Sequence, residues 1–206
     1  MMRHRPDAGR FPAVAERAAR TAQSHVGIAR RLARDPEARE RRLATVRFPL
    51  GLRGVTAAVM MAEKLVKIAT EEANSSNDER DAGEKAALLA TLGAPESGTL
   101  PPAMRGQVKQ LEDDQKRRAK RSVTDSLDRT LTDLLSFYRD VLIIQMGNAV
   151  ELVNVELRSE LTEFAGHSTA ETTLARMDAI NKARTRITTS NVAPLLTIES
   201  MAASLI

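Results

Sequence analysis

The sequence predicts an all-α protein, a helical bundle closed around an aliphatic core. Segment 126–147 is the strongest indication, because its apolar residues recur every three or four positions and form one helical stripe. A second indication is composition: 42% of the 206 residues are hydrophobic but only 2% are aromatic, which suits packed helices. No segment predicts a strand. The stripe consists of Leu127, Leu131, Leu134, Leu135, Tyr138, Leu142 and Met146, whereas Asp128, Arg129, Asp133, Arg139 and Asp140 mostly lie off it.

Three helices are expected before residue 49. Residues 13–34 read as two short helices, with Ser24 as the N-cap of the second. Asp35 and Pro36 then end one helix and begin another, since proline fits the first helical position. This third helix is expected to run to about residues 48–49. The following break falls at Pro49, Gly51 and Gly54.

Two more helices are expected before a linker. The first runs from Val55 to about Asn74, on the stripe Val55, Val59, Ala62, Val66 and Ala69. The polar residues 75–78 predict a turn, and residues 79–92 predict another helix that ends at Gly93. Residues 94–102 hold three of the eight prolines and predict the linker.

The C-terminal half predicts a long helix and three shorter ones. The long helix covers residues 103–146, with room for a kink near 122–124, and ends at Gly147 and Asn148. Helices follow at residues 152–164 and 169–187, the second capped by Ser168 or Thr169. After a break at 188–191, the last helix spans residues 194–205. Its apolar face is Leu195, Ile198, Met201 and Leu205.

The formal net charge of +4 is unevenly distributed. Residues 1–47 hold 12 Lys/Arg against 5 Asp/Glu, and residues 102–130 hold 8 against 5. The other two stretches, 48–101 and 131–206, are each acidic by 3. Two basic blocks favour an acidic partner such as nucleic acid, although solvated helix faces account equally well for the second block.

Residue types that carry catalysis are scarce. There is no Cys, which excludes disulfides and thiolate metal sites. The three histidines, His4, His25 and His167, stand in no nucleophile or zinc-binding pattern, and no phosphate-cradling loop is present. The paired carboxylates at 71–72 and 113–114 are expected to face solvent. We therefore expect no catalytic residue, no metal, no cofactor and no small-molecule substrate.

The basic run at residues 115–121 is the strongest electrostatic feature. Phosphate contact is one interpretation. A solvated or subunit-facing role is the favoured one, because no aromatic residue is interleaved for base stacking and residues 112–114 are acidic. The basic residues of the run are Lys116, Arg117, Arg118, Lys120 and Arg121.

The sequence shows neither a membrane-spanning segment nor a secretory signal. It has no run of about 18 apolar residues, so no membrane span is expected. The first 12 residues lack the apolar middle of a secretory signal and are expected to be a disordered tail. A cytoplasmic protein is the default expectation.

Five blocks, in order, resemble one known family. They are TAQSHVGIARRLARDPEARERR (21–42), VRFPLGLRGVTAAVMMAEKLVKIATEEA (46–73), QVKQLEDDQKRRAKR (107–121), SLDRTLTDLLSFYRDVLIIQMG (126–147) and LARMDAINKARTRITTSNVAPLLTIESMAASL (174–205). Together they look like the C-terminal half of the delta-prime subunits of the DNA polymerase III clamp loader, in their actinobacterial form. The most specific parts are YRDVL and the closing N-V-x-P-x-L-x-x-E. The resemblance covers nearly all residues from about 13 onward.

This resemblance implies a role in DNA replication. Delta-prime is a non-catalytic clamp-loader subunit, held in a ring by a C-terminal helical collar. Residues 13–47 would be a three-helix AAA+ lid and residues 48–206 the collar. The N-terminal AAA+ core and its zinc-binding insert have no counterpart here, so we expect a truncated gene model or a remnant. Gly27 and Arg30 match the place of a nucleotide-sensor arginine, but an ordinary surface or packing arginine is the favoured interpretation.

The leading hypothesis is therefore a subunit that binds other clamp-loader subunits (delta, tau/gamma) and meets DNA only indirectly or weakly. It would be no enzyme itself but part of a DNA-directed DNA polymerase holoenzyme. Arg184, Ile187, Leu195 and Ile198 are candidate contact residues, although an intradomain core role is the favoured interpretation for most of these apolar positions. The alternative is a free helical DNA-binding protein that uses residues 1–47 and 105–121.

Overall fold

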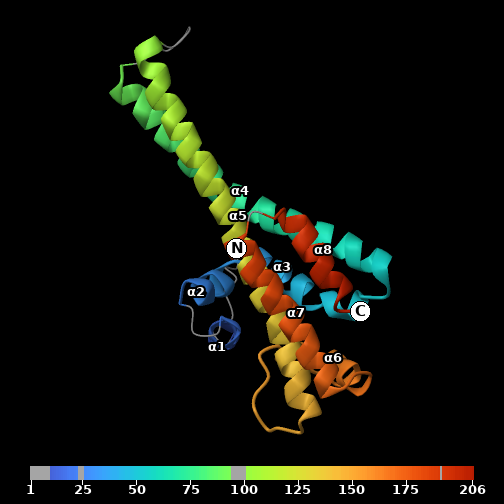
Figure 1. Ribbon diagram of the computed structural model, residues 1–206. Helices are drawn as coiled ribbons and strands as arrows, with labels where there is room; N and C mark the ends of the chain where they lie inside the picture. Colours follow the sequence, from blue (N-terminus) through green and yellow to red (C-terminus); the bar gives the residue numbers. More distant parts are fainter. Residues whose placement is uncertain (1–9, 23–25, 94–100, 191) are drawn as a thin grey trace.

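The structure is a computed structural model that describes residues 10–22, 26–93, 101–190 and 192–206. These residues form helices and no strand, which confirms the predicted all-α class. Figure 1 shows a body of packed helices from which a long two-helix arm projects. None of the described helices has the length and apolarity that a membrane crossing requires.

The described helices follow one another in a simple order along the chain. They are α1 (Arg10–Thr21), α2 (Val26–Arg34), α3 (Pro36–Val46), α4 (Val55–Thr91), α5 (Pro102–Gln145), α6 (Arg158–Gly166), α7 (Ala170–Thr189) and α8 (Pro194–Ala203). Short 3₁₀ helices cover Phe48–Gly51 (η1) and Val155–Leu157 (η2).

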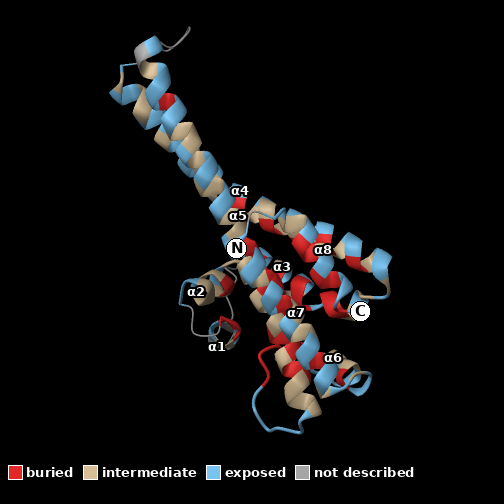
Figure 2. Cartoon of the chain, viewed as in Figure 1, coloured by how far each residue is buried: buried red, intermediate tan, exposed pale blue. Residues whose placement is uncertain are grey.

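The C-terminal half of α5 is the centre of the body. Helices α3, α4, α6 and α7 pack against α5, and α8 lies against both α4 and α7. Buried residues gather where these helices meet (Figure 2). The predicted stripe on α5 supplies much of this core, since Leu127, Leu131, Leu134 and Tyr138 are buried, whereas Met146 at its end is exposed.

An aromatic cluster widens the stripe. Phe137 is fully buried, and its ring makes edge-to-face contacts with Tyr138 at 5.3 Å and with Phe164 of α6 at 5.1 Å between centroids. Full burial of one such side chain contributes roughly 1.5–3 kcal/mol. Burial also raises the pKa of Tyr138 above its ordinary value.

Several predicted helix ends are confirmed. Asp35 caps α3 by accepting the backbone N–H of Ala38 at 3.1 Å, and this bond lowers the pKa of Asp35. Thr169 caps α7 by accepting the N–H of Thr172 at 3.2 Å. Gly93 and Gly147, both with φ of +63°, follow the ends of α4 and α5. The proposed cap Ser24 lies outside the described residues.

Helix α4 differs from the prediction in two ways. It runs without a break from Val55 to Thr91, so the predicted turn at 75–78 is wrong. Asn77 keeps its amide inside the helix by donating to the carbonyl of Ala73 at 2.9 Å, and α5 packs along the same stretch. Packing thus overrides the weak helix propensity of Ser and Asn.

The predicted buried stripe of α4 is confirmed only in its later part. Ala62 and Ala69 are buried and Val66 packs partly buried against the core, whereas Val55 and Val59 are exposed. Small residues supply most of the buried face and let α5 and α8 approach closely. They are Ala58, Ala62, Ala69 and Ala73, together with Leu65.

The second half of α4 and the first half of α5 form the arm. Residues 94–100 of the predicted linker lie outside the described residues, and α5 already begins at Pro102. Helix α5 continues through residues 122–124 without a break. The two helices run in opposite directions along the arm, so the end of α4 and the start of α5 both lie at its far end (Figure 1).

The segment after α5 is not helical where a helix was expected. A 3₁₀ turn at Val155–Leu157 comes first, and α6 begins only at Arg158 rather than at residue 152. The carboxylate of Asp140 accepts the backbone N–H groups of Val153 and Asn154, which holds these residues outside a helix. The last helix, α8, has its apolar residues on the predicted face.

Helices α1 and α2 form a small lobe beside the body. Its apolar cluster consists of Ala18, Leu32 and Ala38, the last of these from α3. Helix α3 also sends Val46 into the main core, so it joins the lobe to the bundle. The predicted domain boundary between residues 47 and 48 stays a prediction.

Candidate functional site

A charged cleft of about 650 Å³ lies where the lobe meets the bundle. Helices α2 and α3 form one wall, and α4 and α5 form the other. Guanidinium and carboxylate groups line it in equal number: Arg31, Arg41, Arg42 and Arg129 face Glu72, Asp125, Asp128 and Asp133. Most of these charged groups are engaged by other side chains, as the following contacts show.

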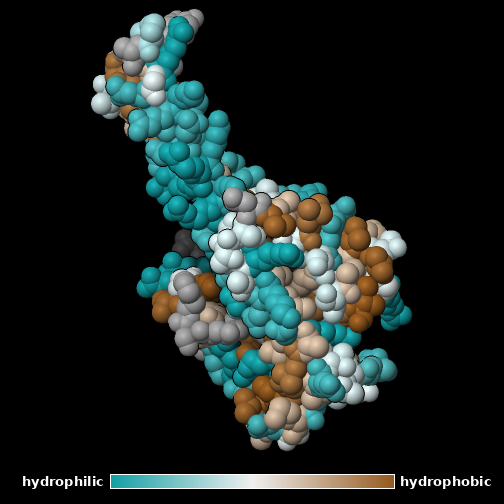
Figure 3. All heavy atoms as spheres, in the orientation of Figure 1, coloured by the Kyte–Doolittle hydropathy of each residue, from teal (hydrophilic) through white to brown (hydrophobic). Residues whose placement is uncertain are grey.

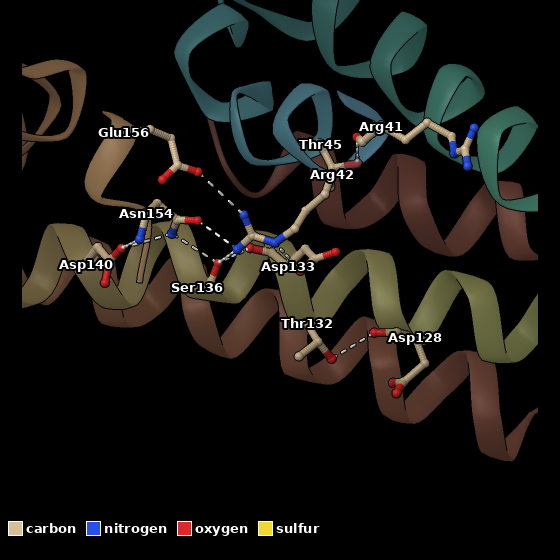
Figure 4. A network of polar contacts seen from close by, with 10 residues as sticks. All are labelled: Arg41, Arg42, Thr45, Asp128, Thr132, Asp133, Ser136, Asp140, Asn154 and Glu156. Carbon is tan, nitrogen blue, oxygen red and sulfur yellow. Dashed lines mark hydrogen bonds and ion pairs between the residues drawn. The ribbon is translucent and has the colours of Figure 1, made fainter. Parts of the chain in front are cut away.

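Arg42 is the most heavily used of these groups (Figure 4). Its side chain is 7% exposed, and its Nε donates to Asp133 Oδ1 at 3.0 Å. Its Nη2 donates to Ser136 Oγ at 3.3 Å and to Asn154 Oδ1 at 2.8 Å. A buried arginine with this many acceptors holds three segments together: α3, α5 and the loop after α5.

Asp140 continues the same network on the next turn of α5. It is fully buried, although the sequence placed it off the apolar stripe. Its oxygens accept the backbone N–H groups of Val153 at 3.0 Å and Asn154 at 2.7 Å, and also Asn154 Nδ2 at 2.9 Å. The Arg139 guanidinium donates to it as well, at 2.9 Å. Both oxygens of the buried Asp140 carboxylate are thereby paired, as a buried charge requires.

Asp133 has an environment that could suit acid–base work. Burial raises its pKa, and the neighbouring Arg42 opposes that rise. A general acid also needs open access to a substrate and a second catalytic group. Here the Asp133 carboxylate binds Arg42 instead, which is a structural use of the group.

A second set of contacts joins α2 to the bundle through Glu72. This carboxylate forms an ion pair with Arg31 of α2, lies 3.8 Å from Arg129 and accepts from Ser126 at 3.3 Å. The expectation that both Glu71 and Glu72 face solvent is therefore wrong for Glu72, whose side chain is only 17% exposed. The cleft thus serves to attach the lobe.

The described residues offer little other chemistry. They hold no group of three or more His, Cys, Asp or Glu that is placed to bind a metal. His167 is exposed, and its Nδ1 lies 2.7 Å from the carbonyl oxygen of Glu163; His4 and His25 lie outside the described ranges. The contacts described above join segments of the chain to one another.

The sensor-like pair from the sequence sits on α2. Gly27 and Arg30 are both exposed, and Gly27 lines the cleft. It is the neighbouring Arg31, not Arg30, that contributes its side chain to the cleft. A nucleotide-sensing role for Gly27 and Arg30 stays a prediction.

The five cations of the basic run differ in their contacts and exposure. Arg118 turns toward α4 and binds Asp81 at 2.7 Å and Glu84 at 3.2 Å. Lys116 and Arg117 are exposed and pair within α5 with Asp113 and Asp114. Lys120 and Arg121 are exposed. One of the five is thus a structural link across the arm, and four remain on its surface.

The ion pairs between α4 and α5 along the arm, which we call the seam, predict a pH effect at Glu84. Hydrogen bonds from Arg118 and Arg80 lower the pKa of Glu84 from 4.5 to about 2. A carboxyl group with a depressed pKa stabilises the fold above its ordinary pKa, and this contribution disappears as the pH falls from about 4.5 toward 2. Carbon-13 NMR titration of the Glu84 carboxyl should show the low pKa. In Arg118→Ala it should rise toward 4.5; an unchanged value would contradict this account of the seam.

The candidate contact residues near the C-terminus mostly lie inside the fold. Ile198 is fully buried, Ile187 is 7% exposed and Leu195 is partly buried against the core. Arg184 binds Asp128 of α5 through two hydrogen bonds, at 2.8 and 3.1 Å. A neighbouring subunit would have to reach other residues.

Exposed apolar side chains that a neighbouring subunit could contact lie on α4 and α8, and they were not predicted from the sequence. Val55, Val59 and Met60 of α4 and Leu196 of α8 are 67%, 38%, 65% and 60% exposed. We call these four the α4–α8 face, since the two helices pack side by side. Hydrophobic surface over this side of the body is visible in Figure 3. A sequence signal existed for Met60 alone, which lies about 160° around the helix from Ala62 and so could not share its buried stripe.

Comparison with protein-family models, with curated protein sequences and with solved structures gave no match to this chain.

Proposed function

We propose that this chain is a non-catalytic subunit of a DNA polymerase III clamp loader, of the delta-prime kind, whose helical bundle holds it in the loader ring. The α4–α8 face is the observation that carries the proposal. Four large apolar side chains stand exposed on two adjacent helices, and such groups mark protein–protein contact surfaces.

Two further features support an assembly role. The ionisable groups of the charged cleft bind one another, with Arg42 on Asp133, Arg31 on Glu72 and Arg184 on Asp128. The five blocks that resemble delta-prime also span both the lobe and the bundle. In this proposal α1–α3 act as the lid, the bundle from η1 onward acts as the collar, and Gly27 and Arg30 sense no nucleotide.

The proposed partners are the delta and tau/gamma subunits, and the proposed compartment is the cytoplasm, where the replication machinery works. The chain would join a DNA-directed DNA polymerase holoenzyme without an active site of its own. It would take no cofactor and no small-molecule substrate. Its contact with DNA would be indirect or weak.

A pull-down with purified delta and tau/gamma subunits tests this proposal. The tagged chain should retain the partners, and Met60→Glu/Leu196→Glu should lose at least about 90% of that retention, because two buried charges cost several kcal/mol at an interface. Met146→Glu/Leu174→Glu is the matched control, since both residues are exposed apolar side chains outside the α4–α8 face.

Three outcomes would contradict the proposal. The first is that the chain retains neither partner. The second is that the Met60/Leu196 variant binds as well as the wild type, and the third is that the control variant loses as much retention. Sequence-specific DNA binding by the free chain, together with retention of neither partner, would favour the competing function as a helical DNA-binding protein.

A further inference from the structure

The outer face of α5 along the arm carries a line of positive charge. Arg105, Lys109, Lys116 and Lys120 are all exposed. Separations of four, seven and four residues return to the same side of an α-helix, so these four side chains form one row. We call this row the cation stripe. With a rise of 1.5 Å per residue, it extends over roughly 22 Å.

Contacts between the two arm helices fix the direction of this stripe. Arg118, on the opposite side of α5, binds the Asp81 carboxylate of α4, and Gln115, on the flank between, donates to the Asp81 backbone carbonyl. Because that side faces α4, the stripe faces away from it. The arm itself projects from the body, so the stripe stands clear of the bundle (Figure 1).

Several acidic residues of the arm are bound to cations outside the stripe. Asp81 and Glu84 bind Arg118, and Glu112 binds Lys85 at 2.7 Å. Asp113 lies 3.9 Å from Lys116, but that side chain is 78% exposed. An ion pair so open to water contributes only about 0–1 kcal/mol, so Lys116 can exchange its partner readily.

We propose that the cation stripe binds the phosphate backbone of duplex DNA without regard to base sequence. A straight row of cations on one helix matches a polyanion that carries a phosphate every 3.4 Å or so along each strand. Base stacking is not part of the mode, because residues 74–122 include no Phe, Tyr or Trp. Backbone contacts of this kind position a protein on DNA and do not specify a sequence.

This inference goes beyond the assembly function and stands on different residues. The α4–α8 face is on the body, whereas the stripe is on the arm. The two proposals can therefore fail separately: a variant of the stripe should still be retained by the loader subunits, and a variant of the face should still bind DNA.

Fluorescence anisotropy with a labelled duplex of roughly 25 base pairs and mixed sequence tests the stripe in the full-length chain. Wild-type affinity should fall steeply between about 50 and 200 mM salt. The variant Lys109→Glu/Lys116→Glu/Lys120→Glu should bind at least about tenfold more weakly. Its slope of log affinity against log salt should be shallower by about 3, one for each phosphate contact that is lost.

A matched control separates the stripe from net charge. Lys64→Glu/Lys67→Glu/Lys182→Glu makes the same change in charge at exposed positions of α4 and α7, and its binding should stay within about twofold of the wild type, because these positions lie outside the stripe. Circular dichroism of both variants should match the wild type, since all six side chains are exposed.

The proposal would be overturned if the stripe variant bound the duplex as tightly as the wild type. It would also be overturned if the control lost as much affinity as the stripe variant. Retention on vesicles of phosphatidylserine and phosphatidylcholine through the stripe, without duplex binding, would also overturn it and would assign the row to a membrane surface.

Discussion

Replacing Asp140 by alanine should lower the free energy of unfolding by about 3–5 kcal/mol. Asp140 is fully buried and accepts two backbone N–H groups and the side-chain amide of Asn154. The substitution leaves these donors without their acceptor, and each stranded buried donor costs about 1–3 kcal/mol. The loop from residue 148 to η2 should loosen first, because Asp140 is what fastens it to α5.

Urea denaturation followed by circular dichroism measures this loss. Asp178→Ala is the control, since Asp178 is 60% exposed and pairs only with Lys182 on the same helix. That change should cost less than about 0.5 kcal/mol. A similar small cost for Asp140→Ala would show that the network is not what holds the loop.

Replacing Phe137 by alanine should cost a comparable amount, about 3–5 kcal/mol. The Phe137 ring is fully buried and lies between Tyr138 of its own helix and Phe164 of α6. Alanine removes both edge-to-face contacts and leaves a cavity that rigid neighbouring helices cannot fill. The packing of α6 against α5 should suffer most.

Phe137→Leu separates the cavity from the loss of the ring. Leucine keeps most of the apolar volume, so its cost should be clearly smaller than that of alanine. Urea denaturation of both variants gives the comparison. Equal stability of the alanine variant and the wild type would place Phe137 outside the core.

Local sequence signals predicted most of the helices. The α5 stripe, the Asp35–Pro36 start of α3 and the Thr169 cap of α7 each depend on residues within a few positions of one another. Such signals act through backbone geometry and helix periodicity, which the order of residues alone expresses. These elements could therefore be predicted without knowledge of the tertiary structure.

The errors arose where distant residues decide local structure. Residues 75–78 read as a turn, but the arm helix opposite keeps them helical. Residues 152–157 read as α-helix, but Asp140 binds the backbone N–H groups at their start and keeps them out of a helix. In each case a partner far along the chain outweighs local propensity.

The charged cleft could not be predicted for the same reason. Arg42 lies 91 residues from Asp133 and 112 from Asn154, and nothing in the local pattern distinguishes it from the surface arginines around it. The basic run was visible as a charge cluster, but its division into one link across the arm, Arg118, and several exposed cations was not. The α4–α8 face was missed because a valine at a helical position reads as core.

We propose that this chain is a clamp-loader subunit, held in the ring by the α4–α8 face. Sedimentation velocity of the chain mixed with purified delta and tau/gamma subunits tests it most directly. The account predicts a single faster-sedimenting species that contains all three, and its loss with Met60→Glu/Leu196→Glu. Free sedimentation of the wild-type chain beside an unchanged peak of its proposed partners would contradict it.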